Sequence, residues 1–247
     1  MLRRLISALL CVALMASASV GYAQQSVLRV AVIEDSPPLS YIDTDGKLAG
    51  FNVALAEALC AEMKVKCTFG LTRLDKLIDD VANGTFDLGA LAFLVTPERQ
   101  RKILFTQPVY RSTTFWLAKP DILPGEKKVR VSTFRGSLQE KYIKAKGWDS
   151  ISADTYTEFI EQFSAGVTNA MVTPLMTSVA LLREPRFLAL GLVATSLRVP
   201  ELEGDACYVV NPKRADLKEI LDKALISVRE QGIFARINTQ YLPLRIN

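Results

Sequence analysis

The sequence of 247 residues contains no histidine. Without imidazole, a Ser-His-Asp or Cys-His nucleophile and His-ligated zinc or haem are excluded. Cysteine is also scarce, with four residues in all, and no Walker A or G-x-G-x-x-G segment occurs. We therefore expect no bound metal and no cofactor. These absences do not exclude an enzyme that works with carboxylates, lysine or tyrosine.

The charge of the chain is nearly balanced. Removal of residues 1–23, which we expect to be cleaved, leaves 224 residues with 28 basic and 26 acidic side chains. Such a balance gives no electrostatic basis for binding nucleic acid, and we expect no nucleic-acid partner. A hydrophobic content of 49% suffices for one large domain or two small ones.

The N-terminal segment has the pattern of a secretory signal peptide. A basic start at Met1–Arg4 precedes an apolar run at Leu5–Val20 and a small-residue cleavage pattern at Gly21–Ala23. The run is shorter than the roughly 20 residues of a membrane-spanning helix. We expect cleavage after residue 23 and an exported protein; an uncleaved anchor is the alternative.

Export changes how the remaining cysteines are interpreted. Cys60 and Cys67 would join a helix end to a strand start in an oxidising compartment, where disulfides persist. The spacing favours a disulfide over the alternative of two buried thiols. Cys207 is then left without a partner, and we expect it to be buried in a strand.

Strand and helix patterns alternate along the first half of the chain. Short β-branched or apolar runs predict strands, and apolar residues three and four apart predict helices. The predicted strands are Leu28–Ile33, Lys66–Leu71, Phe86–Phe93 and Thr113–Lys119. The predicted helices are one that Asn52 caps and that extends to Met63, and another over Leu74–Val81 closed by Asn83-Gly84.

A second α/β unit follows a linker at Pro120–Gly125. Its predicted strands are Val129–Thr133, Ile151–Ala153 and Asn169–Val172, with a further apolar run at Leu188–Val193 and a later strand at Cys207–Val210. Its predicted helices are Ser137–Ala145, Tyr156–Ser164 and Leu175–Arg183, before a final helix over Ala215–Tyr241 broken near Gly232. The alternation predicts an α/β fold of two lobes with parallel-rich sheets.

Ligands of open α/β sheets bind at the carboxyl ends of strands, so two turns there are candidate sites. In Thr96-Pro97-Glu98-Arg99, Arg99 lies in the first turn of a helix, where a cation is unfavourable unless an anion lies nearby. The alternative is an internal pair between Arg99 and an acidic side chain. In Phe134-Arg135-Gly136-Ser137, Ser137 offers a hydroxyl and an N–H at a helix start.

Several segments together resemble the bacterial extracellular solute-binding proteins of family 3, the periplasmic receptors of polar amino acid ABC importers. The segments are LRVAVIEDSPPLSY, DGKLAGFN, the Cys60 to Cys67 spacing, NGTFD and TPER. The resemblance is specific before residue 120, fainter up to residue 200, and returns in Ala215–Tyr241.

The resemblance implies a fold and a set of partners. The fold is the α/β, two-lobed periplasmic binding protein clamshell (type II) with two chain crossovers. The lobes would be residues 26–118 plus 206–247 and residues 119–205, with crossovers near Lys119–Leu123 and Arg198–Asp205. The implied partners are a small-molecule ligand, a carboxylate or an amino acid, and an ABC permease in the inner membrane. We expect a periplasmic monomer.

The resemblance also carries over to single residues. Arg99 matches the carboxylate-binding arginine, Leu94 a residue whose backbone N–H faces the carboxylate, and Ser137 with Leu138 the turn of the second lobe that faces it too. Ser36 and Leu74 stand where the family often has aromatic residues over the ligand, and Ala92 replaces a serine that holds the ligand amine.

The position that pairs with the ligand ammonium departs most from the family. The matching residues are Thr173 and Pro174, and neither is acidic. This combination favours a small carboxylate over a standard amino acid, unless Glu34 or Asp35 supplies the missing charge. We expect the ligand to contact Ser36, Ala92, Leu94, Arg99, Ser137, Leu138 and Thr173.

The sequence is compatible with three functions. A transport receptor would close on its ligand and present the closed form to a permease. A cyclohexadienyl-dehydratase-like enzyme would need an acid in the cleft, and none stands at the matching position. A soluble sensor component would present the ligand to a membrane receptor instead.

Overall fold

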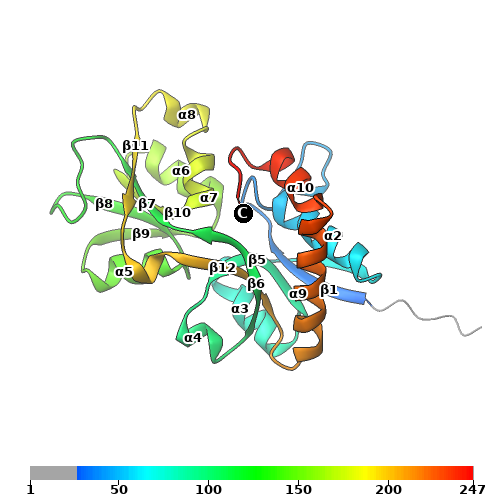
Figure 1. Ribbon diagram of the computed structural model, residues 1–247. Helices are drawn as coiled ribbons and strands as arrows, with labels where there is room; N and C mark the ends of the chain where they lie inside the picture. Colours follow the sequence, from blue (N-terminus) through cyan, green and yellow to red (C-terminus); the bar gives the residue numbers. More distant parts are fainter. Residues whose placement is uncertain (1–26, 247) are drawn as a thin grey trace, which may run out of the picture.

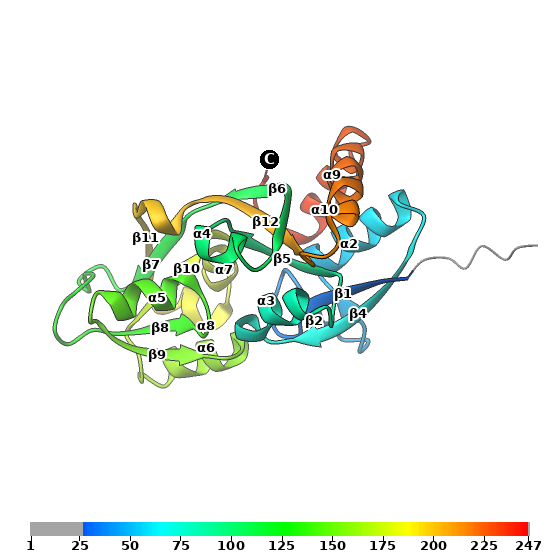
Figure 2. The same ribbon diagram turned by 90° about the horizontal axis from the view of Figure 1, so that it is seen from below.

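The computed structural model describes residues 27–246, so the predicted signal peptide lies outside the described part of the chain (Figure 1, Figure 2). Two five-stranded sheets form the centres of two lobes, with strand orders β4-β1-β5-β12-β6 and β11-β7-β10-β8-β9. Figure 1 shows the lobes side by side. Within residues 27–246, no helix combines the length and the apolar character needed to cross a bilayer.

The first sheet has helices on both faces. Its strands are β1 (Val27–Ile33), β4 (Lys66–Thr72), β5 (Leu88–Leu94), β6 (Leu104–Ser112) and β12 (Gly204–Val210). Helices α2 (Phe51–Glu62), α9 (Ala215–Glu230) and α10 (Ile233–Tyr241) pack on one face, and α3 (Leu74–Asn83) packs on the other. The lobe also holds the β2 (Tyr41–Ile42) and β3 (Leu48–Ala49) hairpin and α4 (Pro97–Gln100).

The second sheet is covered in the same way. Its strands are β7 (Thr114–Ala118), β8 (Arg130–Phe134), β9 (Asp149–Ala153), β10 (Ala170–Pro174) and β11 (Val193–Leu197). Alternate residues of β7 and β10 pack against α5 (Leu138–Ala145) on one face and α6 (Tyr156–Ser164) on the other. The remaining helices are α7 (Leu175–Leu181), α8 (Pro185–Leu188) and the short 3-10 helix η1 (Pro200–Leu202).

The chain passes from the first sheet to the second earlier than the sequence predicts. β7 pairs with β10 and β11 and thus belongs to the second sheet, so the crossover is the β6–β7 junction at Thr113. The expected boundary at residue 118 and the expected crossover at Lys119–Leu123 are therefore wrong. The cause is nonlocal, because strand pairing across distant segments decides which sheet a strand joins.

The return connection runs beside the first crossover. β11 ends at Leu197 and β12 begins at Gly204, where Gly204 pairs with Ser112 of β6. The Thr114 hydroxyl donates a hydrogen bond to the Leu202 carbonyl at 3.0 Å. The two connections between the lobes thus lie side by side, which is the arrangement of a hinge.

Local sequence signals explain several helix ends. Gly84 closes α3 in the left-handed conformation, and Gly232 separates α9 from α10 with a φ of 70°. The predicted helix over Tyr156–Ser164 has the same bounds as α6, and the Thr155 side chain caps it.

Two local predictions are wrong. Gly50 and not Asn52 is the N-cap of α2, and Asn52 is buried, where it accepts a hydrogen bond from the Tyr208 hydroxyl at 3.0 Å. No strand was predicted for β6, which contains Pro108. Because β6 is an edge strand, a missing proline N–H can be tolerated there.

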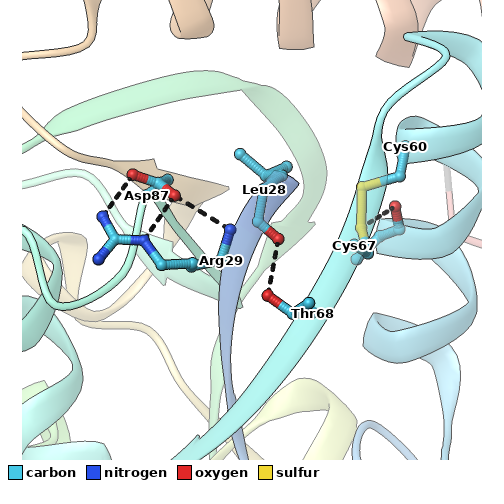
Figure 3. Close-up of a disulfide and its surroundings, with 7 residues drawn as sticks. Leu28, Arg29, Cys60, Cys67, Thr68 and Asp87 are labelled. Carbon is cyan, nitrogen blue, oxygen red and sulfur yellow. Dashed lines mark hydrogen bonds and ion pairs between the residues drawn. A yellow bond between two sulfur atoms is a disulfide. The ribbon is translucent and has the colours of Figure 1, made fainter. Parts of the chain in front are cut away.

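The first lobe contains the predicted disulfide. Cys60 at the end of α2 and Cys67 in β4 are bonded, and Cys207 is a buried free cysteine, so both cysteine predictions are confirmed (Figure 3). Figure 3 also shows the bidentate pair between Arg29 of β1 and Asp87, which precedes β5. Burial alone would raise the pKa of Asp87, but the hydrogen bonds and charge of Arg29 hold it below its ordinary value.

Candidate functional site

A cavity lies between the two lobes, at the carboxyl ends of strands β1, β5, β8 and β10. Its volume is about 110 Å³, whereas a single water needs roughly 10–15 Å³. The first lobe lines it with residues that follow β1 and β5, and the second lobe with residues that follow β8 and β10. The cavity therefore has room for a small molecule held by both lobes.

Arg99 lines this cavity from the short helix α4. Thr96 caps that helix by accepting a hydrogen bond from the Arg99 backbone N–H at 3.3 Å, which fixes where the side chain starts. The residue is 9% exposed, its guanidinium Nη1 donates to the Leu94 carbonyl at 3.0 Å, and the guanidinium lies over the Phe93 ring. Burial lowers the pKa of Arg99 to about 10, so the group is charged at neutral pH.

No acidic side chain of the described residues neutralises Arg99. Between residues 27 and 246, no carboxylate oxygen lies within 4.0 Å of its side-chain nitrogens, and the neighbouring Glu98 instead pairs with Lys141 of the second lobe. The alternative of an internal acidic pair is therefore not found in this range. A buried arginine with one carbonyl acceptor keeps N–H groups available for an anion.

The start of α5 faces the same cavity from the second lobe. The Ser137 side chain caps α5 by accepting a hydrogen bond from the Glu140 N–H at 3.0 Å, and the Ser137 N–H donates to the Phe134 carbonyl at 3.1 Å. The hydroxyl hydrogen of Ser137 stays available, because its oxygen acts as the acceptor in that cap. The first N–H groups of α5, beginning at Leu138, have no partner within the helix.

Six of the seven predicted contact residues line the cavity together: Ser36, Ala92, Leu94, Arg99, Ser137 and Leu138. Leu74 and Pro174 line it as well. Thr173 does not, because its side chain is fully buried and its hydroxyl is hydrogen-bonded to the Ser178 hydroxyl at 2.7 Å. The prediction that Thr173 contacts the ligand therefore has no support, and Pro174 takes the position at the cavity.

Among residues 27–246, two acidic residues line the cavity, and both accept hydrogen bonds. Asp154 accepts hydrogen bonds from Arg73 at 2.9 Å and from Arg135 at 2.6 Å. Asp35 accepts one from the backbone N–H of Thr157 at 2.8 Å. Glu34 is exposed and is not a lining residue.

Sequence reasoning missed several residues of the site. Tyr110 lines the cavity from β6, a strand that was not predicted, and burial raises its pKa, so its hydroxyl keeps its proton. Gln139 lines it from the first turn of α5 and is held by a hydrogen bond to Thr114 at 2.8 Å. Its position two residues after Ser137, in the first turn of a predicted helix, could have indicated Gln139 as a site residue.

The two lobes touch around the cavity. Arg73 of the first lobe pairs with Asp154 of the second, and Lys141 of the second pairs with Glu98 of the first. A Cβ atom built on Gly136 would lie 2.7 Å from the Asp75 Cα atom of the first lobe. The structure is thus a closed arrangement in which groups from both lobes surround the cavity.

Residues 28–243 match the family described as bacterial extracellular solute-binding proteins, family 3. The ABC transporter arginine-binding protein 1 of Escherichia coli (strain K12) is 26% identical over 95% of this chain and 98% of its own length. The lysine/arginine/ornithine-binding periplasmic protein of the same strain is 24% identical over 100% of this chain and 99% of its own length. A solved ancestral arginine-binding protein bound to arginine is 22% identical, with a TM-score of 0.78 over 88% of this chain and 99% of its own.

The chain belongs to the bacterial extracellular solute-binding proteins of family 3. Its fold is the predicted two-lobed α/β clamshell with two chain crossovers.

Proposed function

We propose that the protein is the periplasmic substrate-binding component of an ABC importer. It captures a small carboxylate-bearing solute between its lobes and delivers it, as a monomer, to a permease in the inner membrane. The observation that carries this proposal is the buried Arg99, which lines the interlobe cavity without an acidic partner among the described residues. The names of the two bacterial relatives, one an ABC transporter protein and one periplasmic, support the role and the location.

The second lobe favours a carboxylate ligand that has no α-ammonium group. Pro174 carries no charge, and Thr173 is turned into the interior. Both acids at the cavity are engaged, Asp154 by two arginines and Asp35 by the start of α6. Burying an ammonium group without an acidic partner is costly. This cost would offset part of the binding free energy that the carboxylate of an amino acid gains from Arg99.

Catalysis has less support than binding. A dehydratase needs a proton donor within reach of the leaving group. Within residues 27–246, the carboxylic side chains that line the cavity are Asp35 and Asp154, and both already accept hydrogen bonds; Tyr110 also lines it, but burial raises its pKa and makes it a weak proton donor. We therefore propose that the cleft binds its solute without transforming it.

The experiment has two stages. Thermal-shift screening of the chain without residues 1–23 against amino acids, small carboxylates and oxyanions identifies the ligand class, because a ligand that prefers the native state raises the melting temperature. Calorimetry then compares pentanoate with L-norvaline, which has the same skeleton plus an ammonium group. We expect pentanoate to bind more tightly. Tighter binding of L-norvaline would overturn the preference for a non-amino carboxylate, and stabilisation by no carboxylate would overturn the proposed function.

A further inference from the structure

Apart from Arg99, two aspartates and a few hydroxyl and amide groups, the cavity is lined mainly by apolar side chains. Apolar lining residues come from both lobes, and they include Ile33, Leu39, Leu74, Leu91 and Phe93 from the first lobe and Phe134, Leu138 and Met176 from the second. The Phe134 ring is stacked on Phe159 of α6 with centroids 4.5 Å apart. This stacking holds one wall of the cavity in place, so the apolar surface is preformed.

The charged side chains of the same cavity favour one anionic group on the solute and give little support to a second charge. Within residues 27–246, Arg99 is the one basic side chain among its lining residues. The carboxylate of Asp154 accepts hydrogen bonds from Arg73 and Arg135, and that of Asp35 accepts one from the Thr157 N–H in the first turn of α6. A second carboxylate would lose its hydration without meeting a second basic side chain, and a terminal ammonium would compete for carboxylates that already accept hydrogen bonds. An uncharged apolar group would instead be stabilised by leaving water.

We infer that the solute is a monocarboxylate whose remaining part is small, uncharged and apolar. The inference rests on the proposed function, in which Arg99 holds the carboxylate. It separates this protein from relatives whose names state that they bind arginine, lysine or ornithine, all of which carry a cationic side chain.

Three carboxylates of equal carbon-chain length test the inference by calorimetry on the unaltered protein. Pentanoate ends in a methyl group, glutarate in a second carboxylate, and δ-aminovalerate in an ammonium group. We expect pentanoate to bind at least about tenfold more tightly than either of the others. Equal or tighter binding of glutarate or δ-aminovalerate would overturn the inference and leave the proposed function standing. If none of the three binds, the inference fails, and the proposed function fails with it when no other carboxylate raises the melting temperature.

A matched pair of variants locates the apolar group. Leu74→Asp places a carboxylate in the cavity wall, whereas Leu71→Asp places one on β4, where Leu71 is 48% exposed and does not line the cavity. We expect Leu74→Asp to weaken pentanoate binding about tenfold and to strengthen δ-aminovalerate binding. Leu71→Asp should change neither affinity.

The melting temperature of each ligand-free variant controls for loss of the fold, and the ratio of the two affinities does not depend on the folded fraction. An unchanged ratio in folded Leu74→Asp would show that the solute's apolar group does not lie against Leu74. If Leu74→Asp does not fold, Leu74→Gln tests the same contact, with a smaller loss of pentanoate affinity expected.

Discussion

The carboxylate of Asp35, in the first lobe, accepts a hydrogen bond at 2.8 Å from the backbone N–H of Thr157, in the first turn of α6 in the second lobe. The Asp35 carbonyl accepts a second one from the Tyr156 N–H at 3.3 Å. Asp35 of the first lobe thus accepts hydrogen bonds from two N–H groups at the start of α6 in the second lobe. The helix dipole also favours a negative charge at this position. This bond can exist only while the lobes are closed.

Asp35→Ala should therefore shift the protein toward an open form. A lost helix cap costs about 1 kcal/mol, which corresponds to about a fivefold loss of ligand affinity if the contact exists only in the closed state. Solution scattering should show a larger radius of gyration for the ligand-free variant. Glu34→Ala, at the exposed neighbouring position, is the control and should behave as the unaltered protein. Identical affinity and scattering in Asp35→Ala would show that this contact does not contribute to closure.

Gly136 and Gly147 flank helix α5 and provide a matched pair. Both have a positive φ, 79° and 69°, but a Cβ at Gly136 would lie 2.7 Å from the Asp75 Cα atom, whereas at Gly147 it would meet nothing within 4 Å. Alanine at either position should cost about 1 kcal/mol of stability through backbone strain. Only Gly136→Ala should also weaken ligand binding, by about tenfold, because the added methyl group keeps the lobes apart. Equal affinities of the two variants would contradict a closed binding form with this contact.

The Arg29–Asp87 pair predicts a specific acid sensitivity. The folded-state pKa of Asp87 lies below its ordinary value of 3.8, so the pair's contribution is complete above that value and is lost as the pH falls through the folded pKa. Urea unfolding between about pH 3 and about pH 7 should show Asp87→Asn less stable than the unaltered protein at neutral pH, with the difference shrinking in acid. Glu57→Gln, on the exposed side of α2, should show no such convergence. If the stability difference between Asp87→Asn and the unaltered protein does not change with pH, the ion pair is not its cause.

The cysteines can be counted by thiol titration of the chain without residues 1–23. Burial, and to a smaller extent the negative charges of Asp205 and Asp222, raises the pKa of the Cys207 thiol to about 12. Because this thiol is also buried, the native protein should show no reactive thiol. Unfolding without reductant should expose one, and three would exclude the disulfide. Reduction should lower the free energy of unfolding by about 2.5 kcal/mol, as expected for so short a loop.

Local signals in the sequence predicted most helices and strands of this fold. The cap at Thr155, the glycines at 84 and 232, and the apolar spacing of α3 act within a few residues, so they can be recognised without the structure. The sheet that β7 joins and the buried partner of Asn52 depend on segments far away in the chain. Those features could not be predicted from local patterns.

The residues of the site also fall into those that local patterns indicate and those that depend on the fold. Arg99 and Ser137, which line the cavity, could be proposed from the sequence because each lies at a helix start that follows a strand. Tyr110 was missed because Pro108 obscured its strand, and Thr173 was wrongly chosen because a residue's position in a strand does not show which way its side chain points. The hydrogen bonds to Asp35 and to Asp154 from Arg73 join residues far apart in the chain, so the partners of these two acids could not be predicted from local patterns.

The most direct measurement is calorimetry of pentanoate binding to Arg99→Met, with Arg101→Met, exposed and two residues further on, as the control. Charge-assisted hydrogen bonds contribute roughly 1.5 to 3 kcal/mol each, so Arg99→Met should weaken binding at least about tenfold and Arg101→Met should not. The ligand-free Arg99→Met protein should be no less stable than the unaltered one, because a buried charge without an acidic partner is itself costly. Unchanged affinity in Arg99→Met, or loss of its fold without ligand, would contradict the assignment of Arg99 as the receptor for the solute's carboxylate.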